Sequence, residues 1–265
     1  MSEILASIKG KLLGLNQEQR LQAVKGIEIG DHGKQHRLAG PDTVSFFEDF
    51  VGISTQALNP KLVYTEGTDT ATAGMVVIAG IEGFLRVTAG DSAGSIAADG
   101  AMINSELNWK ANQGGLHMQV RIALAAITTV SAFVGFTDTL ALEGPVSLSG
   151  TTFTTNASDA VGFLFDTAAT TDTIRLVGVA ADTDATMQDT GLAFVAATYK
   201  TLRVELSTTG VATFFIDGVS VGTVMTGAVT ATVAMTPVLI IRPEGAVAGR
   251  TFDLDYIDVD ANRGA

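Results

Sequence analysis

The stretch LHMQVRIAL, residues 116–124, decides the fold class because its apolar and polar residues alternate with a period of two. Successive side chains of a β-strand point to opposite faces of a sheet, so this pattern predicts a strand with one buried and one polar face. Residues 202–206, LRVEL, alternate in the same way. Two such strands predict a sheet that packs on an apolar core through one side only.

A hairpin is predicted over residues 214–221, where FFI runs into Asp217-Gly218 and returns through VSV. Asp-Gly supplies the positive φ angles of a tight two-residue turn, and Thr209-Gly210 is predicted to make the preceding turn. No helix is predicted after residue 44, so we expect an all-β fold, a two-sheet antiparallel jelly-roll sandwich. Further strands, separated by turn-forming residues, are predicted at 75–79, 83–88, 101–108, 130–137, 160–166, 174–180, 192–197, 236–242 and 251–259.

The beginning of the chain has a different pattern. Apolar residues recur there at helical three-to-four spacing, and Asn16 followed by Gln19 predicts the capped start of a second short helix. Residues 27–42 contain three glycines, two histidines and one proline, which predicts an extended connector. We therefore expect a partly helical N-terminal anchoring arm, residues 1–43, and a jelly-roll domain, residues 44–265.

Charge is divided between these two parts of the chain. Residues 1–40 hold six basic and four acidic side chains, a net charge of +2, whereas the remaining 225 hold 10 and 24, a net charge of −14. A short amphipathic stretch cannot bury its apolar stripe alone, so the arm is expected to dock on its own domain, on a sister subunit or on another protein. The residues expected to make this contact are Ile4, Leu5, Ile8, Lys9, Lys11, Leu12, Leu15, Arg20 and Lys25.

Composition narrows the classes of function. The chain of 265 residues has no cysteine, which excludes disulfides and thiolate metal sites. Its net charge of −12 argues against nucleic acid and anionic membranes as partners. We expect no membrane span, because no window of about 18 uninterrupted apolar residues occurs. The first residues lack the features of a signal peptide, which predicts synthesis in a cytosol.

Five segments carry a resemblance to a known family: FFEDF (46–50), VGFTD (134–138), VGFLFD (161–166), VATFFIDG (211–218) and FDLDYIDV (252–259). They resemble concanavalin A-like (LamG-type) jelly rolls, and more narrowly the version found in virion proteins of tailed bacteriophages. The resemblance covers about residues 44–262. It implies the architecture much more strongly than it implies a biochemical activity.

Catalytic residues are not evident in the sequence. Related jelly rolls include glycoside hydrolases, which need two carboxylates close together on one strand face. The nearest candidates are Asp253, Asp255, Asp258 and Asp260, but they lie on the closing strand without a glutamate or a tryptophan platform. We interpret them as a solvated strand face. No serine-nucleophile or phosphate-loop motif occurs either, so the chain is expected not to be an enzyme and to need no cofactor.

Acidic clusters and histidines are the candidate metal ligands in the sequence. Lectins of this architecture hold calcium in acidic loops, and the best clusters are Asp182-Thr183-Asp184 with Asp189, then Asp166 with Asp172. Aspartates are also favoured in turns because they bond their own backbone, and that interpretation is preferred. The three histidines, His32, His36 and His117, are interpreted as surface residues. We therefore expect no metal site.

Glycan binding stays open as an alternative. Sugars stack on exposed aromatic rings, and Trp109, beside Asn108, Lys110 and Asn112, is a possible glycan contact. The other interpretation of this tryptophan, which is favoured, is that it caps one end of the sandwich core.

Taken together, these observations predict a structural virion protein. We expect a capsid decoration or cement protein, made in the cytoplasm of a bacterial host, that binds the major capsid protein or another virion protein on the outer capsid surface. A homo-oligomer such as a trimer is expected, and its binding would stabilise the assembled lattice. The alternative is a carbohydrate-binding, lectin-like module for host-surface attachment in a tail or fibre position. A glycan-cleaving enzyme is the third hypothesis.

Overall fold

The computed structural model describes residues 29–31, 34–36, 42–50, 61–69, 72–78, 83–91 and 94–263. The chain divides into two compact units, Met1–Val44 and Ser45–Ala265. In the first unit, β1 (Ile29–Asp31) and β2 (Lys34–His36) form an antiparallel hairpin, within the stretch predicted to be a connector. The helices predicted for the first 25 residues lie outside the described part of the chain.

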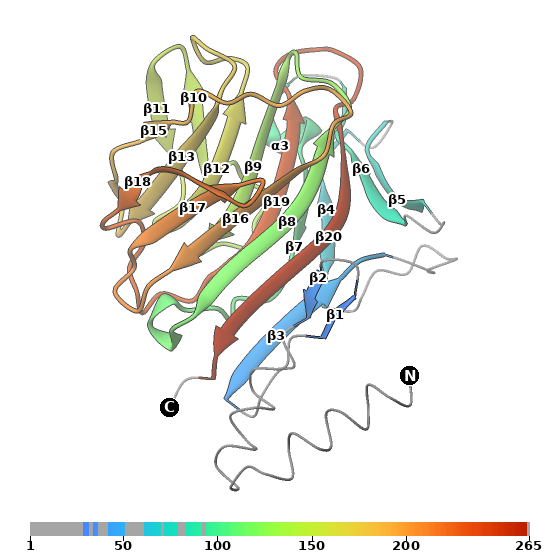
Figure 1. The fold of residues 1–265 in the computed structure, drawn as a ribbon. Coiled ribbons are helices and arrows are strands. Elements are labelled where there is room, and N and C mark those ends of the chain that lie inside the picture. The colour runs from blue at the N-terminus through green and yellow to red at the C-terminus, as the bar shows by residue number, and fades with distance from the viewer. Residues whose placement is uncertain are drawn as a thin grey trace, which may run out of the picture. The chain divides into compact units, whose positions relative to one another are not determined.

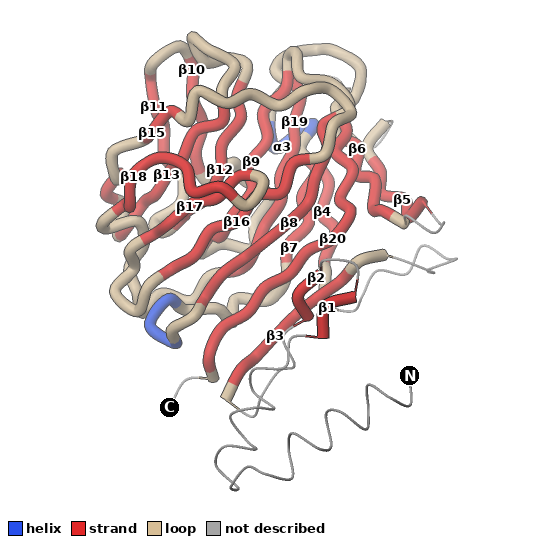
Figure 2. The backbone as a smooth tube through the Cα atoms, viewed as in Figure 1, coloured by secondary structure: helices blue, strands red, loops and turns tan. Residues whose placement is uncertain are grey.

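Two eight-stranded antiparallel sheets form the sandwich (Figures 1 and 2). The β8 sheet has the order β18 (Val219–Met225), β17 (Ala212–Ile216), β16 (Lys200–Leu206), β8 (Leu116–Leu124), β20 (Thr251–Asn262), β6 (Phe84–Thr88) and β5 (Gly74–Ile78), and β3 (Thr43–Glu48) also pairs with β20. The β9 sheet has the order β14 (Thr183–Asp184), β13 (Ile174–Ala180), β12 (Ala160–Asp166), β9 (Val130–Thr137), β19 (Thr236–Pro243), β7 (Ala101–Asn104) and β4 (Val63–Glu66), with β15 (Gln188–Asp189) beside β13. The predicted all-β sandwich is confirmed.

The main core lies between the inner faces of the two sheets. The alternation of residues 116–124 is confirmed, since the apolar set of β8 is buried while His117, Gln119 and Arg121 lie on the other face. Phe163 of β12 meets Phe214 of β17 edge to face, with ring centroids 5.4 Å apart. Aromatic pairs in this geometry add about 0.5–1.5 kcal/mol to their burial.

The closing strand β20 changes its alternation partway along. Phe252 and Leu254 are buried, but the next buried apolar residues are Ile257 and Val259, so the spacing lengthens from two residues to three. The register with β8 shifts between Leu254 and Tyr256, as expected for a β-bulge. The bulge keeps apolar side chains inside on both halves of the strand, and it places Tyr256, Asp258 and Asp260 on the outer face.

A second apolar cluster covers the outer face of the β9 sheet. Because Phe163 points to the inner core, its neighbours on β12, including Leu164, point outward. Leu164 and Phe133 are nonetheless buried, together with Val146 and Leu148 of a small hairpin. This hairpin, β10 (Val146–Ser149) and β11 (Thr152–Thr155), packs on strands of the β9 sheet. The central strands of the β9 sheet are therefore buried on both faces.

Most predicted strands are present, and the Asp217-Gly218 hairpin is confirmed, with φ of 52° and 79° at the two turn residues. The strand predicted at 192–197 is wrong. The backbone has positive φ angles at Gly191 and Ala197, and residues 192–197 form a loop and not a strand. The apolar side chain of Phe194 is buried from this loop by packing against Phe165. The sequence analysis also missed the β10–β11 hairpin, although Val146, Leu148 and Phe153 alternate on either side of a glycine.

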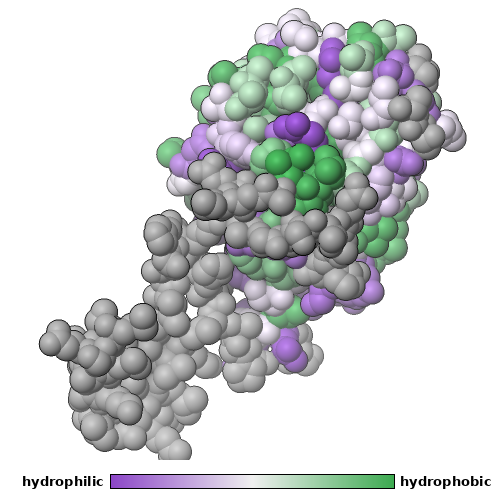
Figure 3. All heavy atoms as spheres, turned by 90° about the vertical axis from the view of Figure 1, so that its right-hand side faces the viewer, coloured by the Kyte–Doolittle hydropathy of each residue, from purple (hydrophilic) through white to green (hydrophobic). Residues whose placement is uncertain are grey.

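The expectation of no helix after residue 44 also needs a small correction. A four-residue helix, α3 (Ile96–Asp99), is capped by Ser95, whose hydroxyl accepts a hydrogen bond from the Ala98 amide, and a three-residue 3₁₀ helix spans Ala111–Gln113. Within the described residues, no helix has the length and apolar character needed to cross a bilayer. Figure 3 shows hydrophilic and hydrophobic residues interspersed over the described surface on the right-hand side of Figure 1, around one compact hydrophobic area.

Candidate functional site

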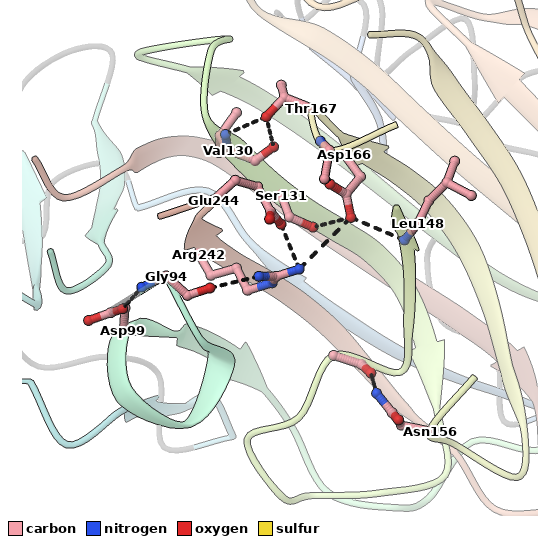
Figure 4. Close-up of polar contacts among 12 residues, drawn as sticks. Gly94, Asp99, Val130, Ser131, Leu148, Asn156, Asp166, Thr167, Arg242 and Glu244 are labelled. Carbon is pink, nitrogen blue, oxygen red and sulfur yellow. Dashed lines mark hydrogen bonds and ion pairs between the residues drawn. The ribbon is translucent and has the colours of Figure 1, made fainter. Parts of the chain in front are cut away.

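A row of polar residues crosses three neighbouring strands of the β9 sheet. Asp166 at the end of β12 lies opposite Ser131 of β9, and Ser131 lies opposite Arg242 of β19. Alternation places all three on the outer face, at the edge of the second apolar cluster (Figure 4). Neighbouring strands of one sheet thus bring together residues that are far apart in the sequence.

Asp166 is the centre of this row. Its side chain is 0% exposed. One carboxylate oxygen, Oδ2, accepts hydrogen bonds from the Ser131 hydroxyl at 3.1 Å and the Leu148 amide at 3.2 Å, and Oδ1 accepts one from the Ala168 amide at 3.0 Å. The bond to Leu148 fastens the covering hairpin to the sheet. Burial of a carboxylate is tolerated because several donors replace its water.

Arg242 links Asp166 to a second carboxylate, that of Glu244. Its guanidinium lies 4.0 Å from the Asp166 carboxylate and 2.5 Å from that of Glu244. It also donates to the Gly94 carbonyl at 2.8 Å, just before α3, and the Gly94 amide donates to Asp99 (Figure 4). We refer to Asp166, Ser131, Arg242 and Glu244 as the buried carboxylate cluster.

The carboxyl group of Glu244 has a raised pKa. Burial, and next the negative charge of Asp166, raise the pKa of Glu244 from 4.5 to about 7, although Arg242 acts in the opposite direction. A carboxyl group whose pKa lies near 7 can donate or accept a proton at neutral pH. Glu244 is 18% exposed, whereas Asp166 has no exposed surface. A molecule from solution can therefore reach only the Glu244 and Arg242 ends of the cluster in this conformation.

The buried carboxylate cluster is not among the sites predicted from the sequence. The sequence places Asp166 only in a candidate calcium cluster with Asp172, which is exposed on a loop, and it marks neither Glu244 nor Arg242 as a site residue. The available signal was the run of apolar residues 238–241, which passes directly into Arg242-Pro243-Glu244. Polar residues that continue a strand buried on both faces need partners in the fold.

Asp253 and Asp255, two of the four aspartates interpreted from the sequence as a solvated strand face, lie on the outer face of the β8 sheet. Arg86 donates two hydrogen bonds to Asp253, from Nε to Oδ1 at 2.7 Å and from a terminal guanidinium nitrogen to Oδ2 at 2.8 Å. Asp255 accepts a hydrogen bond from Arg121 at 2.7 Å, and this guanidinium also lies 4.3 Å from the ring centroid of Tyr199. Both carboxylates are therefore paired with arginines, and each side chain is only 17% exposed, so this part of the strand face is less solvated than the sequence predicted.

The other two aspartates of this strand meet a histidine. Asp260 lies directly across from His117 in the β8–β20 register, and its carboxylate is 3.7 Å from the imidazole Nε2. Ligand atoms of His117, Asp258 and Asp260 all lie within 4.8 Å of one another, and among the described residues no other three histidines or carboxylates do so. Burial, then the charge of Asp260, raise the pKa of Asp258 to about 6, against the opposing effect of His117.

The aspartates of the candidate calcium loop make hydrogen bonds and an ion pair within the protein. Asp182 has a φ of 60° and accepts a hydrogen bond from Ser158, and Asp184 accepts one from Thr155. Asp189 pairs with Arg175 at 2.8 Å. These contacts support their interpretation as turn residues.

Trp109 is not available as a stacking surface for sugars. The residue is only 7% exposed, and its backbone pairs with Met235. The possible glycan contact at Trp109 is therefore corrected, and its burial supports the other interpretation, that it fills the core. The residues expected to anchor the arm, from Ile4 to Lys25, lie outside the described residues, as do His32 and the side chain of His36.

Comparisons with known proteins show what the fold is similar to. No protein-family model and no curated protein sequence matches the chain. Among solved structures, a protein of unknown function from Shewanella oneidensis is 12% identical, with a TM-score of 0.53 over 94% of this chain and 95% of that one. The β-glucanase of Bacillus licheniformis is 14% identical, with a TM-score of 0.54 over 81% and 97%. The carbohydrate recognition domain of Emp47p is 11% identical, with a TM-score of 0.54 over 84% and 98%.

These likenesses establish the architecture as a concanavalin A-like jelly-roll sandwich. They also correct the expectation that the chain is not an enzyme, because several of the similar structures are glycoside hydrolases, including a family 16 endo-glucanase from Bacteroides ovatus. At this level of identity only the fold is shared. The exclusion of enzymes drawn from the sequence therefore no longer stands.

Proposed function

We propose that this chain is a structural virion protein, in which the N-terminal arm of residues 1–43 attaches the jelly roll to an assembled capsid. The observation that carries the proposal is the division of charge, +2 over residues 1–40 against −14 over the rest. A basic segment with an apolar stripe is suited to bind an acidic, partly apolar surface on another protein. The acidic jelly roll would be repelled from that surface and held outward.

The described structure offers two supports for this role. The chain forms separate compact units, with the boundary at Val44 and Ser45, close to the limit of the arm. The outer face of the β9 sheet, where an extended polymer could lie on an open sheet, is filled by the protein's own hairpin. An arm that binds only the assembled lattice would stabilise that lattice by mass action.

Deletion of residues 1–40 tests the proposal directly. The shortened chain should remain soluble, keep its β-sheet circular dichroism and no longer co-sediment with purified capsids of its virus. The matched variant Leu12→Asp/Leu15→Asp should also lose incorporation, while Lys61→Asp, a charge change in the jelly roll, should retain it. Incorporation of the deletion variant at the full copy number would contradict the proposal.

A second candidate, glycan binding or cleavage, is favoured by the likeness to a carbohydrate recognition domain and to β-glucanases over almost their whole length. Glu244 has the ionisation required of a general acid at neutral pH. On the β8 sheet, Tyr199 and Phe215 also place aromatic rings beside charged groups, where Arg121 and Arg203 lie over them. Such rings could contribute a stacking surface if an arginine moved aside.

This second candidate has its own test. The full chain is incubated with mixed-linkage β-glucan, and both pelleting with the polymer and release of reducing ends are measured. Binding that weakens in Tyr199→Ala supports a lectin-like module, whereas cleavage that falls at least tenfold in Glu244→Gln supports an enzyme. Neither binding nor cleavage, with normal capsid incorporation, favours the structural role.

A further inference from the structure

We propose that His117, Asp258 and Asp260 form a binding site for a divalent transition-metal ion on the outer face of the β8 sheet. The site joins β8 to the closing strand β20. This inference is independent of the proposed function, because it concerns a different part of the chain from the anchoring arm.

The backbone holds the three residues in one place. His117 and Asp260 are directly opposite each other in the antiparallel register, and Asp258 lies two residues from Asp260 on the same strand face. Cross-strand neighbours have their Cβ atoms about 4.5–5.5 Å apart, within reach of a shared ion. The bulge between Leu254 and Tyr256 is what gives Asp258 and Asp260 this orientation, since Ile257 and Val259 occupy the core side.

The distances agree with coordination by a small cation. Metal–ligand bonds of about 2.0–2.2 Å in a tetrahedral site place neighbouring ligand atoms about 3.3–3.6 Å apart. The Nε2 of His117 and the Oδ2 of Asp260 are 3.7 Å apart, longer than a hydrogen bond, and all three ligand atoms lie within 4.8 Å. Small rotations of the side chains would bring the set onto one ion, and water would supply the remaining position.

Asp260 gives a second, separate indication of a ligand. Its side chain is only 9% exposed, and its Oδ1 is buried without any hydrogen-bond partner. Buried polar atoms are nearly always paired, so an unpaired carboxylate oxygen needs an explanation. This carboxylate also lies beside a second one, that of Asp258, and a cation would offset the repulsion between them. Asp253 and Asp255, on the same strand, are instead neutralised by arginines.

The ligand set indicates the class of ion. One imidazole nitrogen and two carboxylates suit zinc and similar transition metals, whereas calcium and magnesium prefer oxygen ligands alone. With no cysteine in the chain, thiolates cannot compete for the ion. The bound ion would cross-link β8 to β20 and so stabilise the strand that closes the sheet.

Isothermal titration of the full chain with zinc chloride tests the site, with calcium chloride as the comparison. We expect one saturable zinc site, and a melting temperature that rises with zinc. Cobalt provides a direct probe of the ligands, because its visible absorption intensifies in a four-coordinate site with a histidine ligand. The variants His117→Gln and Asp258→Asn should each weaken zinc binding at least tenfold and abolish the cobalt band.

Two controls make the outcome decisive. Asp253→Asn changes an arginine-paired carboxylate of the same strand and should leave zinc affinity unchanged. His32→Gln/His36→Gln removes the other two histidines of the chain and should also retain the site. Absence of saturable zinc binding, a preference for calcium, or equal binding by His117→Gln and the parent chain would each overturn the proposal.

Discussion

The outer faces of the two sheets differ in how deeply their polar side chains are buried. On the β9 sheet this face is apolar and lies beneath the β10–β11 hairpin, and its carboxylate Asp166 is fully buried. On the β8 sheet the corresponding face is polar, and partly exposed charges such as Arg86 and Asp253 pair across it. The central strands of the β9 sheet are therefore buried on both faces, whereas the β8 sheet is buried on its inner face only.

The free-energy cost of disturbing a charged side chain depends on how deeply that side chain is buried. Exposed pairs such as Arg86–Asp253 contribute about 0–1 kcal/mol, because water screens them. A buried carboxylate that loses a partner leaves an uncompensated group, at a cost of about 3–5 kcal/mol. The two faces should therefore respond very differently to similar substitutions.

The largest effect is expected at Gly135 of β9, which lies directly opposite Gly162 of β12. A Cβ atom at Gly135 would lie 2.0 Å from the Val161 carbonyl oxygen, which cannot move without breaking the sheet. Gly135→Ala should therefore destabilise the fold by at least about 4 kcal/mol or prevent soluble expression. At Gly74 of β5 nothing lies within 4 Å of such an atom, so Gly74→Ala is the control. Equal urea midpoints for the two variants would refute this expectation.

A cavity on the covered face should be the next most costly change. Leu164→Ala removes a fully buried side chain beneath the hairpin and should lower the free energy of unfolding by about 3 kcal/mol. Gln119→Ala, on the outer face of the β8 sheet, removes the hydrogen bond that this side chain donates to the Tyr256 hydroxyl and should cost only about 1 kcal/mol. Urea unfolding measures both, and a small loss for Leu164→Ala would mean that the hairpin does not seal this face.

Replacing one aspartate by asparagine on each face compares the contributions of the two negative charges to the free energy of unfolding. Asp166→Asn keeps the shape of the side chain but removes its negative charge, which strengthens the hydrogen bonds that Oδ2 accepts from Ser131 and Leu148, and should cost about 2 kcal/mol. Asp253→Asn, next to Arg86, should cost less than about 1 kcal/mol. Similar losses in the two variants would contradict the distinction between the faces.

The smallest effect is expected in the pH dependence of stability. Folded Glu244 holds its proton up to about pH 7, whereas the unfolded chain releases it near 4.5, so the free energy of unfolding should fall as the pH rises between these values. Asp258, with a pKa of about 6, acts in the same direction at lower pH. Glu244→Gln should therefore flatten the part between pH 6 and 7 in particular. An unchanged slope there, measured by urea unfolding at several pH values, would show that Glu244 titrates normally.

Some of the molecule could be predicted from residue patterns and some could not. The alternation of residues 116–124 and the Asp217-Gly218 turn predicted elements that the structure contains, because both signals are local. The segment 192–197 has a strand-like composition, but it is a loop whose Phe194 side chain packs into the core. No local sequence pattern distinguishes such a loop from a buried strand. The four aspartates of β20 were found, yet their division into two arginine-paired carboxylates and two beside His117 depends on the bulge and on the β8–β20 register.

The all-β class and the basic charge of the N-terminal arm follow from residue patterns alone, since periodicity, turn residues and charge distribution are properties of neighbouring residues. Which sheet face is covered, and which charged side chains meet, depends on how distant strands pair. Asp166 lies on β12, whereas Arg242 lies at the end of β19 and Glu244 directly after it, far along the chain, and their contact follows from the pairing of β12, β9 and β19. Pairing of distant strands is set by packing of the whole core, which no short stretch of sequence contains.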